Sequence, residues 1–458
     1  MKPYPDYKPT GLAWLPEIPK HWKLVRTKQL FFPVDQRSDT GSEELLSVSE
    51  RFGVVKRSSA NVTMFMAASY QGYKLCWPDD LAINSLWAWS YGLGFSKYHG
   101  IISTAYSVFR LKDKERCLPR FYDYFVRSQA FHWELRVRSK GLWKSRYQLS
   151  DDSFLAAPMI LPPADEQAQI VRYLDAMTAK INKLIRAKKR QIALLQEQKQ
   201  AIINQAVTRG LDPNVELKDS GIDWLGPIPK QWEIKTVKQY FKIRKQIAGH
   251  EGYDVLSITQ DGIKIKDIST NEGQMAMSYA GYQLVRPGDF AMNHMDLLTG
   301  YVDRSNYFGV TSPDYRVFEL CDNANCHPDF FLYVFQLYYK RRIFYRYGRG
   351  AASVGRWRLP AREFLNFVIP VPPIISQKRI VRFVKNNTQN IDKNILAVES
   401  QIKILSEYKN SLIAAVVTGK VDVRNIAVEA VPPEDLAPSD DPDESEEQDS
   451  PVSEESEE

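Results

Sequence analysis

The sequence predicts an α+β protein that is duplicated internally, with two mixed α/β heads and two long helices that pair as an antiparallel coiled coil. Each half of the chain holds short apolar runs broken by Gly, Pro, Asn and Asp, followed by a long stretch with almost no helix breaker. The halves repeat one another at an offset of about 210 residues. We therefore expect heads at residues 1–160 and 211–370, helices at 161–210 and 371–425, and a disordered acidic tail at 426–458.

The repeat rests on motifs that recur in the same order. Gly11 to Trp22 reads GLAWLPEIPKHW, and Gly221 to Trp232 reads GIDWLGPIPKQW. Further matches join Gly72-Tyr73 with Gly281-Tyr282, Tyr106 with Tyr315, Phe154 with Phe364, and Gln167 with Gln377. The register drifts by only one residue over this span, so the duplication is not a coincidence.

A proline pair precedes each long helix, at Pro162-Pro163 and Pro372-Pro373, where the first amides lack intrahelical partners anyway. The helices predicted at Ala164 to Ala206 and Ile374 to Val416 would each be about 65 Å long, at about 1.5 Å per residue. Apolar residues spaced by threes and fours form one stripe on each: Ile170, Leu174, Ile181, Ile185, Ile192, Leu195 and Ile202, then Ile380, Val384, Ile391, Ile395, Ile402, Leu405 and Leu412.

Helices with a single apolar stripe are stable when they pair, so we expect a two-helix coiled coil. Pseudo-twofold symmetry between two equivalent repeats favours an antiparallel pair with a head at each end, and a parallel pair with adjacent heads is the alternative. Three polar residues fall on the stripes, Lys199, Asn387 and Lys409, and would help to fix the pairing.

The net charge of +6 conceals an uneven distribution. Residues 429–458 hold 14 acidic residues and no Lys or Arg, which leaves 61 basic residues against 41 acidic ones in the rest of the chain. This surplus favours a polyanionic partner, although a merely soluble basic protein would show the same balance. The tail would act as a solubilising segment or would mimic the charge of DNA.

Several kinds of chemistry lack their motifs. There is no phosphate-binding loop, and the Gly-x-Gly at Tyr91 to Phe95 is better explained as a turn than as a cofactor site. Asp212 with Glu216 and Lys218 resembles a nuclease motif, but the second repeat does not contain it. We expect no metal site, no membrane span and no signal peptide, and four scattered cysteines favour a reducing cytoplasm.

Basic residues interleaved with aromatic ones occur once in each head, a mixture suited to DNA phosphates and base edges. A solvated basic rim would look similar in one head, but its recurrence in both favours function. The predicted DNA-binding residues are Lys97, Arg136, Arg138, Lys140, Lys144 and Arg146 in the first head, and Arg341, Arg342, Arg346, Arg349, Arg356 and Arg358 in the second. The loops after Asn84 and Asn293 differ between the heads within a matched frame, as two different target sequences would require.

These motifs resemble the specificity subunit of type I restriction–modification systems. The Trp14 to Trp22 and Trp224 to Trp232 segments are similar to the starts of its target-recognition domains. The Pro-Pro-x-x-x-Gln-x-x-Ile-Val pattern at Pro162 to Val171 and Pro372 to Val381 is similar to its helix starts. The resemblance covers about residues 10–425, and the acidic tail is not a standard element of the family.

The resemblance implies that each head reads one half of a bipartite, asymmetric site in double-stranded DNA. It also implies that the paired helices dock two methyltransferase subunits, that motor-nuclease subunits join the complex, and that S-adenosylmethionine, ATP and Mg belong to those partners. The chain itself would bind no cofactor and would have no active site, in a prokaryotic cytoplasm. Two alternatives stay open: a coiled-coil adaptor whose heads bind proteins, and a self-contained methyltransferase or nuclease, which would need a catalytic motif that we do not find.

Overall fold

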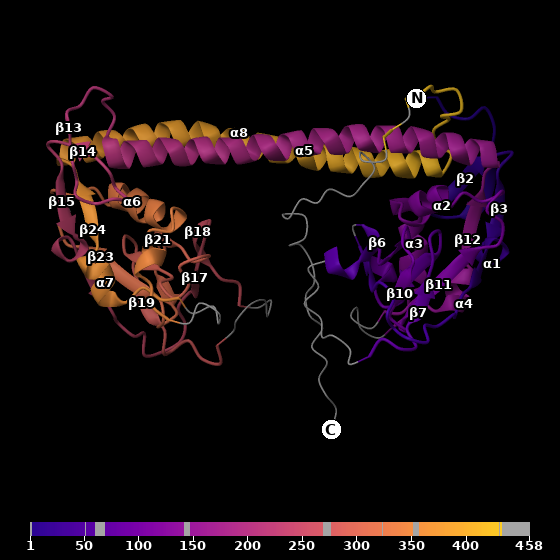
Figure 1. Ribbon diagram of the computed structural model, residues 1–458, viewed down its shortest axis with the longest axis horizontal. Helices are drawn as coiled ribbons and strands as arrows, with labels where there is room; N and C mark the ends of the chain where they lie inside the picture. Colours follow the sequence, from indigo (N-terminus) through magenta and orange to yellow (C-terminus); the bar gives the residue numbers. More distant parts are fainter. Residues whose placement is uncertain are drawn as a thin grey trace. The chain divides into compact units, whose positions relative to one another are not determined.

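The chain divides into two units, and each unit combines one head with part of both long helices (Figure 1). The computed structural model describes residues 2–50, 52–59, 69–141, 147–268, 276–322, 324–350, 357–429 and 431–432. Of these, the residues up to 189 and from 400 onward form unit 1, and residues 190–399 form unit 2. The division therefore falls within the helices and not where the heads were predicted to end.

The head of unit 1 consists of short strands and short helices. Its strands are β1 (Tyr7–Leu12), β2 (Leu15–Pro19), β3 (Lys23–Arg26), β4 (Phe31–Pro33), β5 (Leu46–Ser49), β6 (Gly53–Lys56), β7 (Lys74–Cys76), β8 (Leu81–Asn84), β9 (Leu93–Phe95), β10 (Gly100–Ile102), β11 (Tyr106–Leu111) and β12 (Pro158–Leu161). Its helices are α1 (Thr27–Leu30), α2 (Pro119–Val126), α3 (Gln129–Arg138) and α4 (Asp151–Leu155), with 3-10 turns at Arg57–Ser59 and Ala88–Ser90.

The head of unit 2 repeats this plan, with fewer helices among its described residues. Its strands are β13 (Leu217–Lys218), β14 (Ile228–Pro229), β15 (Glu233–Thr236), β16 (Phe241–Arg244), β17 (Leu256–Thr259), β18 (Gly262–Ile265), β19 (Gln283–Val285), β20 (Phe290–Met292), β21 (Val302–Arg304), β22 (Gly309–Thr311), β23 (Arg316–Leu320) and β24 (Val368–Val371). Its helices are α6 (Pro328–Lys340) and α7 (Ala361–Asn366), with 3-10 turns at Val237–Gln239 and Phe344–Tyr347.

A four-stranded antiparallel sheet lies at the centre of each head, and both sheets have the same strand order. The order is β4-β11-β8-β9 in unit 1 and β16-β23-β20-β21 in unit 2. Phe109 lies opposite Leu81 in the first sheet, and Phe318 lies opposite Phe290 at the equivalent positions of the second. The duplication predicted from the sequence therefore extends to the register of the backbone pairing.

The two long helices are α5 (Ala164–Arg209) and α8 (Ile374–Val417), and each begins just after its proline pair. The side chain of Gln167, in the first turn of α5, is fully buried. Its Oε1 accepts the Leu118 N–H at 2.8 Å, and its Nε2 donates to the Arg116 and Pro162 carbonyls at 3.0 and 2.9 Å. Gln377 makes the equivalent bonds in unit 2, so this glutamine fastens each helix start to its own head.

Replacing Gln167 by leucine should lower the free energy of unfolding by about 2–4 kcal/mol, because it leaves buried backbone groups without hydrogen-bond partners. The measurement is urea denaturation followed by circular dichroism. Gln205→Leu, at an exposed position of the same helix, is the control and should change stability by less than about 0.5 kcal/mol. Equal losses in the two variants would show that Gln167 does not anchor the helix.

Each helix ends against the Pro-x-x-Trp motif of the other repeat. Gly210, after α5, has φ +79°, and a Cβ there would lie 3.3 Å from the Trp232 ring. Gly419, after α8, has φ +75°, and a Cβ there would lie 2.4 Å from Pro19 and 3.0 Å from Trp22. Glycine is needed at both places because the backbone is left-handed and the ring packs directly on it. The opening motif of each repeat therefore packs against the C-terminal end of the other repeat's long helix.

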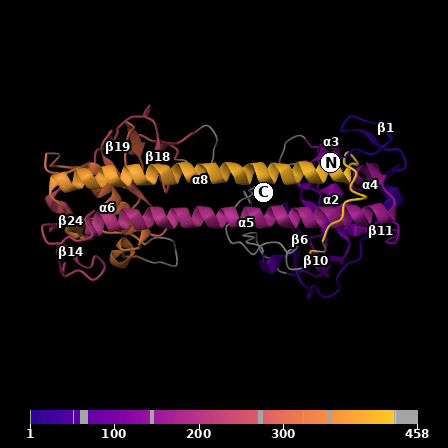
Figure 2. The ribbon, with the colours of Figure 1, turned by 90° about the horizontal axis from the view of Figure 1, so that it is seen from above.

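Within each unit, a segment of α5 lies beside a segment of α8 in antiparallel orientation (Figure 2). In unit 1 the residues of the two stripes that pack together are Ile170, Leu174, Ile181, Ile185, Leu405 and Leu412. In unit 2, Ile203, Ala206 and Val207 share a cluster with Ile380, Val381 and Val384. Ile391 is buried there, and Ile192, Leu195, Ile202 and Ile395 are half-buried. Ile402, which belongs to unit 1, is half-buried as well. The predicted coiled coil is thus confirmed in each unit.

One predicted position on the stripe is wrong. Asn387 is exposed, and its side-chain amide donates to the Phe383 carbonyl one turn earlier at 2.8 Å. Thr388, which is 8% exposed, takes the inward place instead. A strict heptad repeat drifts by about 20° per heptad relative to a straight helix, and here the drift moves the stripe by one residue.

Two lysines on the stripes pair across the helices in matching ways. The Lys199 ammonium lies 2.6 Å from Asp392 in unit 2, and the Lys409 ammonium donates to Asn182 at 3.1 Å in unit 1. Lys199 and Lys409 are equivalent in the repeat, and so are Asn182 and Asp392. Each unit therefore has one polar contact that specifies the antiparallel register, as expected of polar residues in a coiled-coil seam.

Candidate nucleic-acid interface

The predicted basic segment of the first head forms a hairpin at the end of α3. Lys140 and Gln148 exchange two backbone hydrogen bonds, of 3.0 and 2.9 Å. Lys144 and Arg146, which come between them in the sequence, lie outside the described residues. The Leu149 N–H donates to the Ser85 carbonyl at 2.9 Å, so the hairpin is tied to the variable loop that follows β8.

Aromatic rings join this loop to α3. The Trp87 and Trp89 rings stack at 5.8 Å, Trp89 meets Tyr147 of the hairpin edge-on at 6.1 Å, and Tyr91 stacks on His132 of α3 at 4.0 Å. Burial lowers the pKa of His132, with a smaller contribution in the same direction from the Arg136 guanidinium. A neutral histidine at this position stacks without adding a buried charge.

The outer side of α3 is both basic and aromatic. Trp133, Arg136 and Val137 lie at helical spacing on α3, Lys140 follows at the start of the hairpin, and all four are exposed, with 45% of Trp133 and 56% of Val137 accessible. We call these four residues the α3 face. Such a mixture offers charge to phosphates and flat apolar surface to sugars and bases.

The second head has a hairpin at the equivalent place. Arg349 and Arg358 exchange backbone hydrogen bonds of 2.7 and 3.0 Å, and Arg356, which comes between them in the sequence, lies outside the described residues. The Leu359 N–H donates to the His294 carbonyl at 3.0 Å, as Leu149 does to Ser85 in the first head. The attachment is the same, while the exposed side chains differ.

The other predicted arginines of this head are exposed around the hairpin. Arg346 lies on the 3-10 turn Phe344–Tyr347, and Arg342 has a left-handed backbone with φ +54°. Arg349 is 74% exposed and pairs with Glu363 at 2.9 Å. Arg341 instead approaches helix α5, where its Nη1 lies 3.5 Å from the Asn204 side chain.

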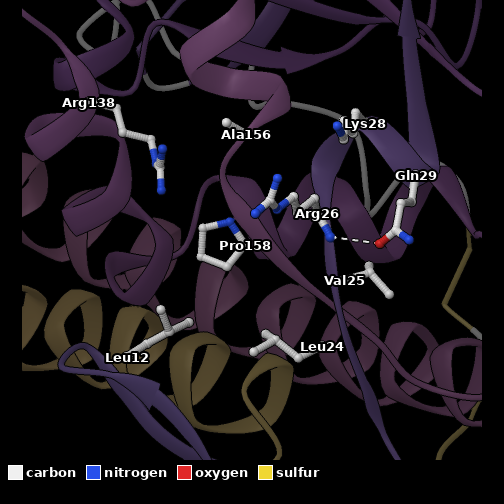
Figure 3. A pocket seen from close by; sticks show the side chains of 9 residues that line it. All are labelled: Leu12, Leu24, Val25, Arg26, Lys28, Gln29, Arg138, Ala156 and Pro158. Carbon is white, nitrogen blue, oxygen red and sulfur yellow. Dashed lines mark hydrogen bonds between the residues drawn. The ribbon is translucent and has the colours of Figure 1, made fainter.

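Two predicted residues of the first head lie elsewhere. Arg138 is on the side of α3 opposite Arg136, where it pairs with Glu134 and lines an open cavity of about 430 Å³. Figure 3 shows Arg138 and Arg26 on one side of this cavity and Leu12 and Leu24 on another. Lys97 lies among charged residues of α2 and α5, and burial lowers its pKa. The structure therefore gathers Arg136 and Lys140 at the hairpin but separates Arg138 and Lys97 from them.

Sequence reasoning missed two residues of the second head, His294 and Arg316. Burial lowers the pKa of His294 to about 3, with further lowering by the Arg316 and Arg358 charges. Arg316 is only 5% exposed, at the start of the central strand β23. The signal in the sequence was an arginine at an inward position of a strand, where the first repeat has Ser107.

The described residues show little of the chemistry of an active site or a metal centre. Cys76, Cys117 and Cys326 are buried thiols, Cys321 is exposed, and none of the four forms a disulfide. In the part of the chain that the structure describes, no three His, Cys, Asp or Glu side chains converge as metal ligands. No helix described there is both long and apolar enough to cross a membrane.

The fold and these surfaces define a duplicated chain whose two equivalent heads each join a basic hairpin to paired helices. No family model matches the sequence. A solved structure described as the structural basis of complex assembly and conformational transition of the type I R-M system is similar over 88% of this chain and 99% of its own, at 15% identity and a TM-score of 0.61. The resemblance found in the sequence is thereby confirmed as a likeness of fold.

Two further structures match over most of their length but superpose less well. The HsdS subunit from Thermoanaerobacter tengcongensis is 14% identical, with 88% of this chain and 98% of that chain covered and a TM-score of 0.41. The type-I restriction-modification S subunit from M. genitalium is 10% identical, with 86% and 96% covered and a TM-score of 0.33.

Proposed function

We propose that this chain is the DNA-specificity subunit of a type I restriction–modification complex. Each head reads one half of a bipartite, asymmetric site, and the paired helices dock two methyltransferase subunits. The chain catalyses no reaction of its own. The methyltransferase and motor-nuclease partners bind S-adenosylmethionine, ATP and Mg. The complex works in the cytoplasm.

The observation that carries this proposal is the pair of hairpins. They occupy equivalent places in two heads whose sheets have the same strand order. The same backbone hydrogen bond joins each hairpin to the loop that follows β8 in one head and β20 in the other. Around this common frame the exposed residues differ, with Trp133, Arg136 and Lys140 in one head and Arg346, Arg349 and Arg358 in the other. One frame with two different basic surfaces suits two different half-sites.

A double variant of the α3 face tests the proposal. Replacing Arg136 and Lys140 by alanine in the complex with its methyltransferase subunits should weaken DNA binding about tenfold or more at ~0.1 M salt. The slope of log affinity against log salt should fall by about two, because two phosphate contacts are lost. Fluorescence anisotropy with a duplex carrying the methylated site, identified by mapping adenine methylation in cells with and without the gene, provides both values.

The control removes the same charge from the same head. Lys112 and Lys114 are exposed on the loop that follows β11, and replacing both by alanine should leave the affinity within about twofold. If the two double variants bind DNA equally, the α3 face is not the interface. Exposed Leu86, Trp87 and Val137 would also suit a protein partner, and an assembled complex that binds no duplex DNA would favour such an adaptor.

A further inference from the structure

A cavity of about 270 Å³ lies at the base of the hairpin in the second head. It is lined by β16, the loop after β20, the start of β23 and the hairpin strand that precedes α7. Its charged and titratable side chains are Arg244, Lys245, His294, Asp314, Tyr315, Arg316 and Arg358. Arg244 is paired with Glu319, and Asp314 is an exposed carboxylate. The remaining groups leave the cavity with a surplus of positive charge.

Two nitrogen atoms in this lining are buried without a partner in the part of the chain that the structure describes. Arg316 uses Nη2 to donate to the Leu359 carbonyl at 2.8 Å, and its guanidinium carbon lies 4.9 Å from the Phe364 ring centre. Its Nη1 and the Nδ1 of His294 have no hydrogen-bond partner among the described residues. Burial lowers the pKa of Arg316 to about 10, so the side chain is still a cation at neutral pH.

Such a cation is costly unless something pairs with it. A buried charge without a counter-charge destabilises a fold by several kcal/mol, and buried donors are nearly always satisfied. In the described part of the chain no carboxylate pairs with Arg316. The arrangement therefore fits a site that is completed by a ligand with negative charge and several acceptor atoms.

The first head does not share this cavity chemistry. Its equivalents of Arg316 and His294 are Ser107 and Ser85, and both are satisfied within the head. Ser107 donates to Asp151, and Ser85 donates to the Ala105 carbonyl at 3.0 Å. The common fold therefore does not require the buried cation, which belongs to the second head alone.

We infer that this cavity binds a phosphate group, supplied by the DNA backbone at the half-site that the second head reads. The source of the phosphate rests on the proposed function, whereas the site itself rests on the cavity. Arg316 Nη2 already donates one N–H to a carbonyl, so a two-bond fork onto a planar base edge would have to share this nitrogen with that carbonyl. Donors on Arg316, His294 and Arg358 come from three different elements and suit the tetrahedral oxygens of phosphate.

The first experiment is calorimetric titration of inorganic phosphate into the whole chain, with chloride at equal ionic strength as the blank. Wild type should bind phosphate saturably, and Arg316→Ser, which installs the residue of the first head, should bind at least tenfold more weakly. Lys264→Ser removes the same charge from an exposed strand position of the same head and should bind as wild type does. Arg358→Ser, on the exposed hairpin strand, gives the same test without altering the buried core.

The second experiment measures DNA affinity of the same variants in the complex with methyltransferase subunits. Arg316→Ser and Arg358→Ser should each lose about tenfold relative to Lys264→Ser. Absence of saturable phosphate binding by wild type would overturn the site. Phosphate binding that depends on Arg316, with unchanged DNA affinity in Arg316→Ser, would overturn the DNA backbone as the source. A complex that binds phosphate through Arg316 but no DNA would support the site and contradict the proposed function.

Discussion

Replacing Trp22 by alanine is expected to lower the free energy of unfolding by about 3–5 kcal/mol, the range for deleting a fully buried tryptophan. Trp22 is inaccessible to solvent, meets Tyr4 edge-on at 5.7 Å and packs against Gly419 at the end of α8. Its indole N–H has no hydrogen-bond partner among the described residues, so the loss comes from packing. The measurement is guanidinium denaturation of wild type and variant.

Trp133→Ala is the matched control, because the same side chain is removed from a position that is 45% exposed. It should cost less than about 1 kcal/mol. The core around Trp22 includes Val416 and Val417, so its loss should also free the end of α8 to exchange amide hydrogens faster. If exchange at the end of α8 is unchanged, the motif does not hold the helix.

The duplication explains why so much of the fold could be predicted. A motif that occurs twice in one chain shows which residues of the two halves correspond, without any other sequence. This correspondence located both heads and both helices. The partner of the Trp22 motif was not predictable in this way, because Pro19 and Gly419 are about 400 residues apart in the chain. Only the antiparallel pairing of the helices in each unit brings them together.

The candidate interface was predictable in part for the same reason. Lys140 and Arg349 begin the matching hairpins of the two heads, Arg136 precedes the first on α3 and Arg358 lies on the second. Their role in DNA binding stays a prediction. Arg138 follows Arg136 by two residues, and two residues turn a helix by about 200°, so the two arginines point to opposite sides. A cluster in the sequence could not distinguish them.

Ile426 and Val428, assigned to the acidic tail, pack against the core of unit 1, so ordered structure extends past that predicted boundary.

The phosphate cavity could not be recognised in the sequence. His294 and Arg316 are each unremarkable residues, 22 positions apart, one in the loop after β20 and the other at the start of β23. What makes them a site is that β20 and β23 are neighbours in the sheet, that Arg316 is buried and that the Nδ1 of the half-buried His294 is inaccessible to solvent. Burial and unsatisfied nitrogen atoms are properties of packing, and apolar periodicity does not report them.

His294 should also make the free energy of unfolding of the second head strongly dependent on pH, with stability lost in acid. Its pKa is about 3 in the folded chain, because of burial first and of the Arg316 and Arg358 charges second, against an ordinary value of 6.5. The unfolded chain therefore binds the proton more readily, so His294 supports folding fully above pH 6.5 and this support is lost as the pH falls toward 3. At about 1.4 kcal/mol per pKa unit, acidification from pH 7 to pH 4 should cost wild type about 3 kcal/mol more than His294→Asn.

Denaturation curves of wild type and His294→Asn at several pH values provide this difference, with His250→Asn as the reference for losing an exposed histidine. Parallel curves for wild type and His294→Asn would show that His294 is not desolvated in the folded chain. The charged groups that line the same cavity include Arg244, Lys245 and Asp314. A phosphate among them would place negative charge beside the imidazole and raise its folded-state pKa. Inorganic phosphate should therefore reduce the acid sensitivity of wild type and leave that of His294→Asn unchanged, because only wild type has a proton to gain there.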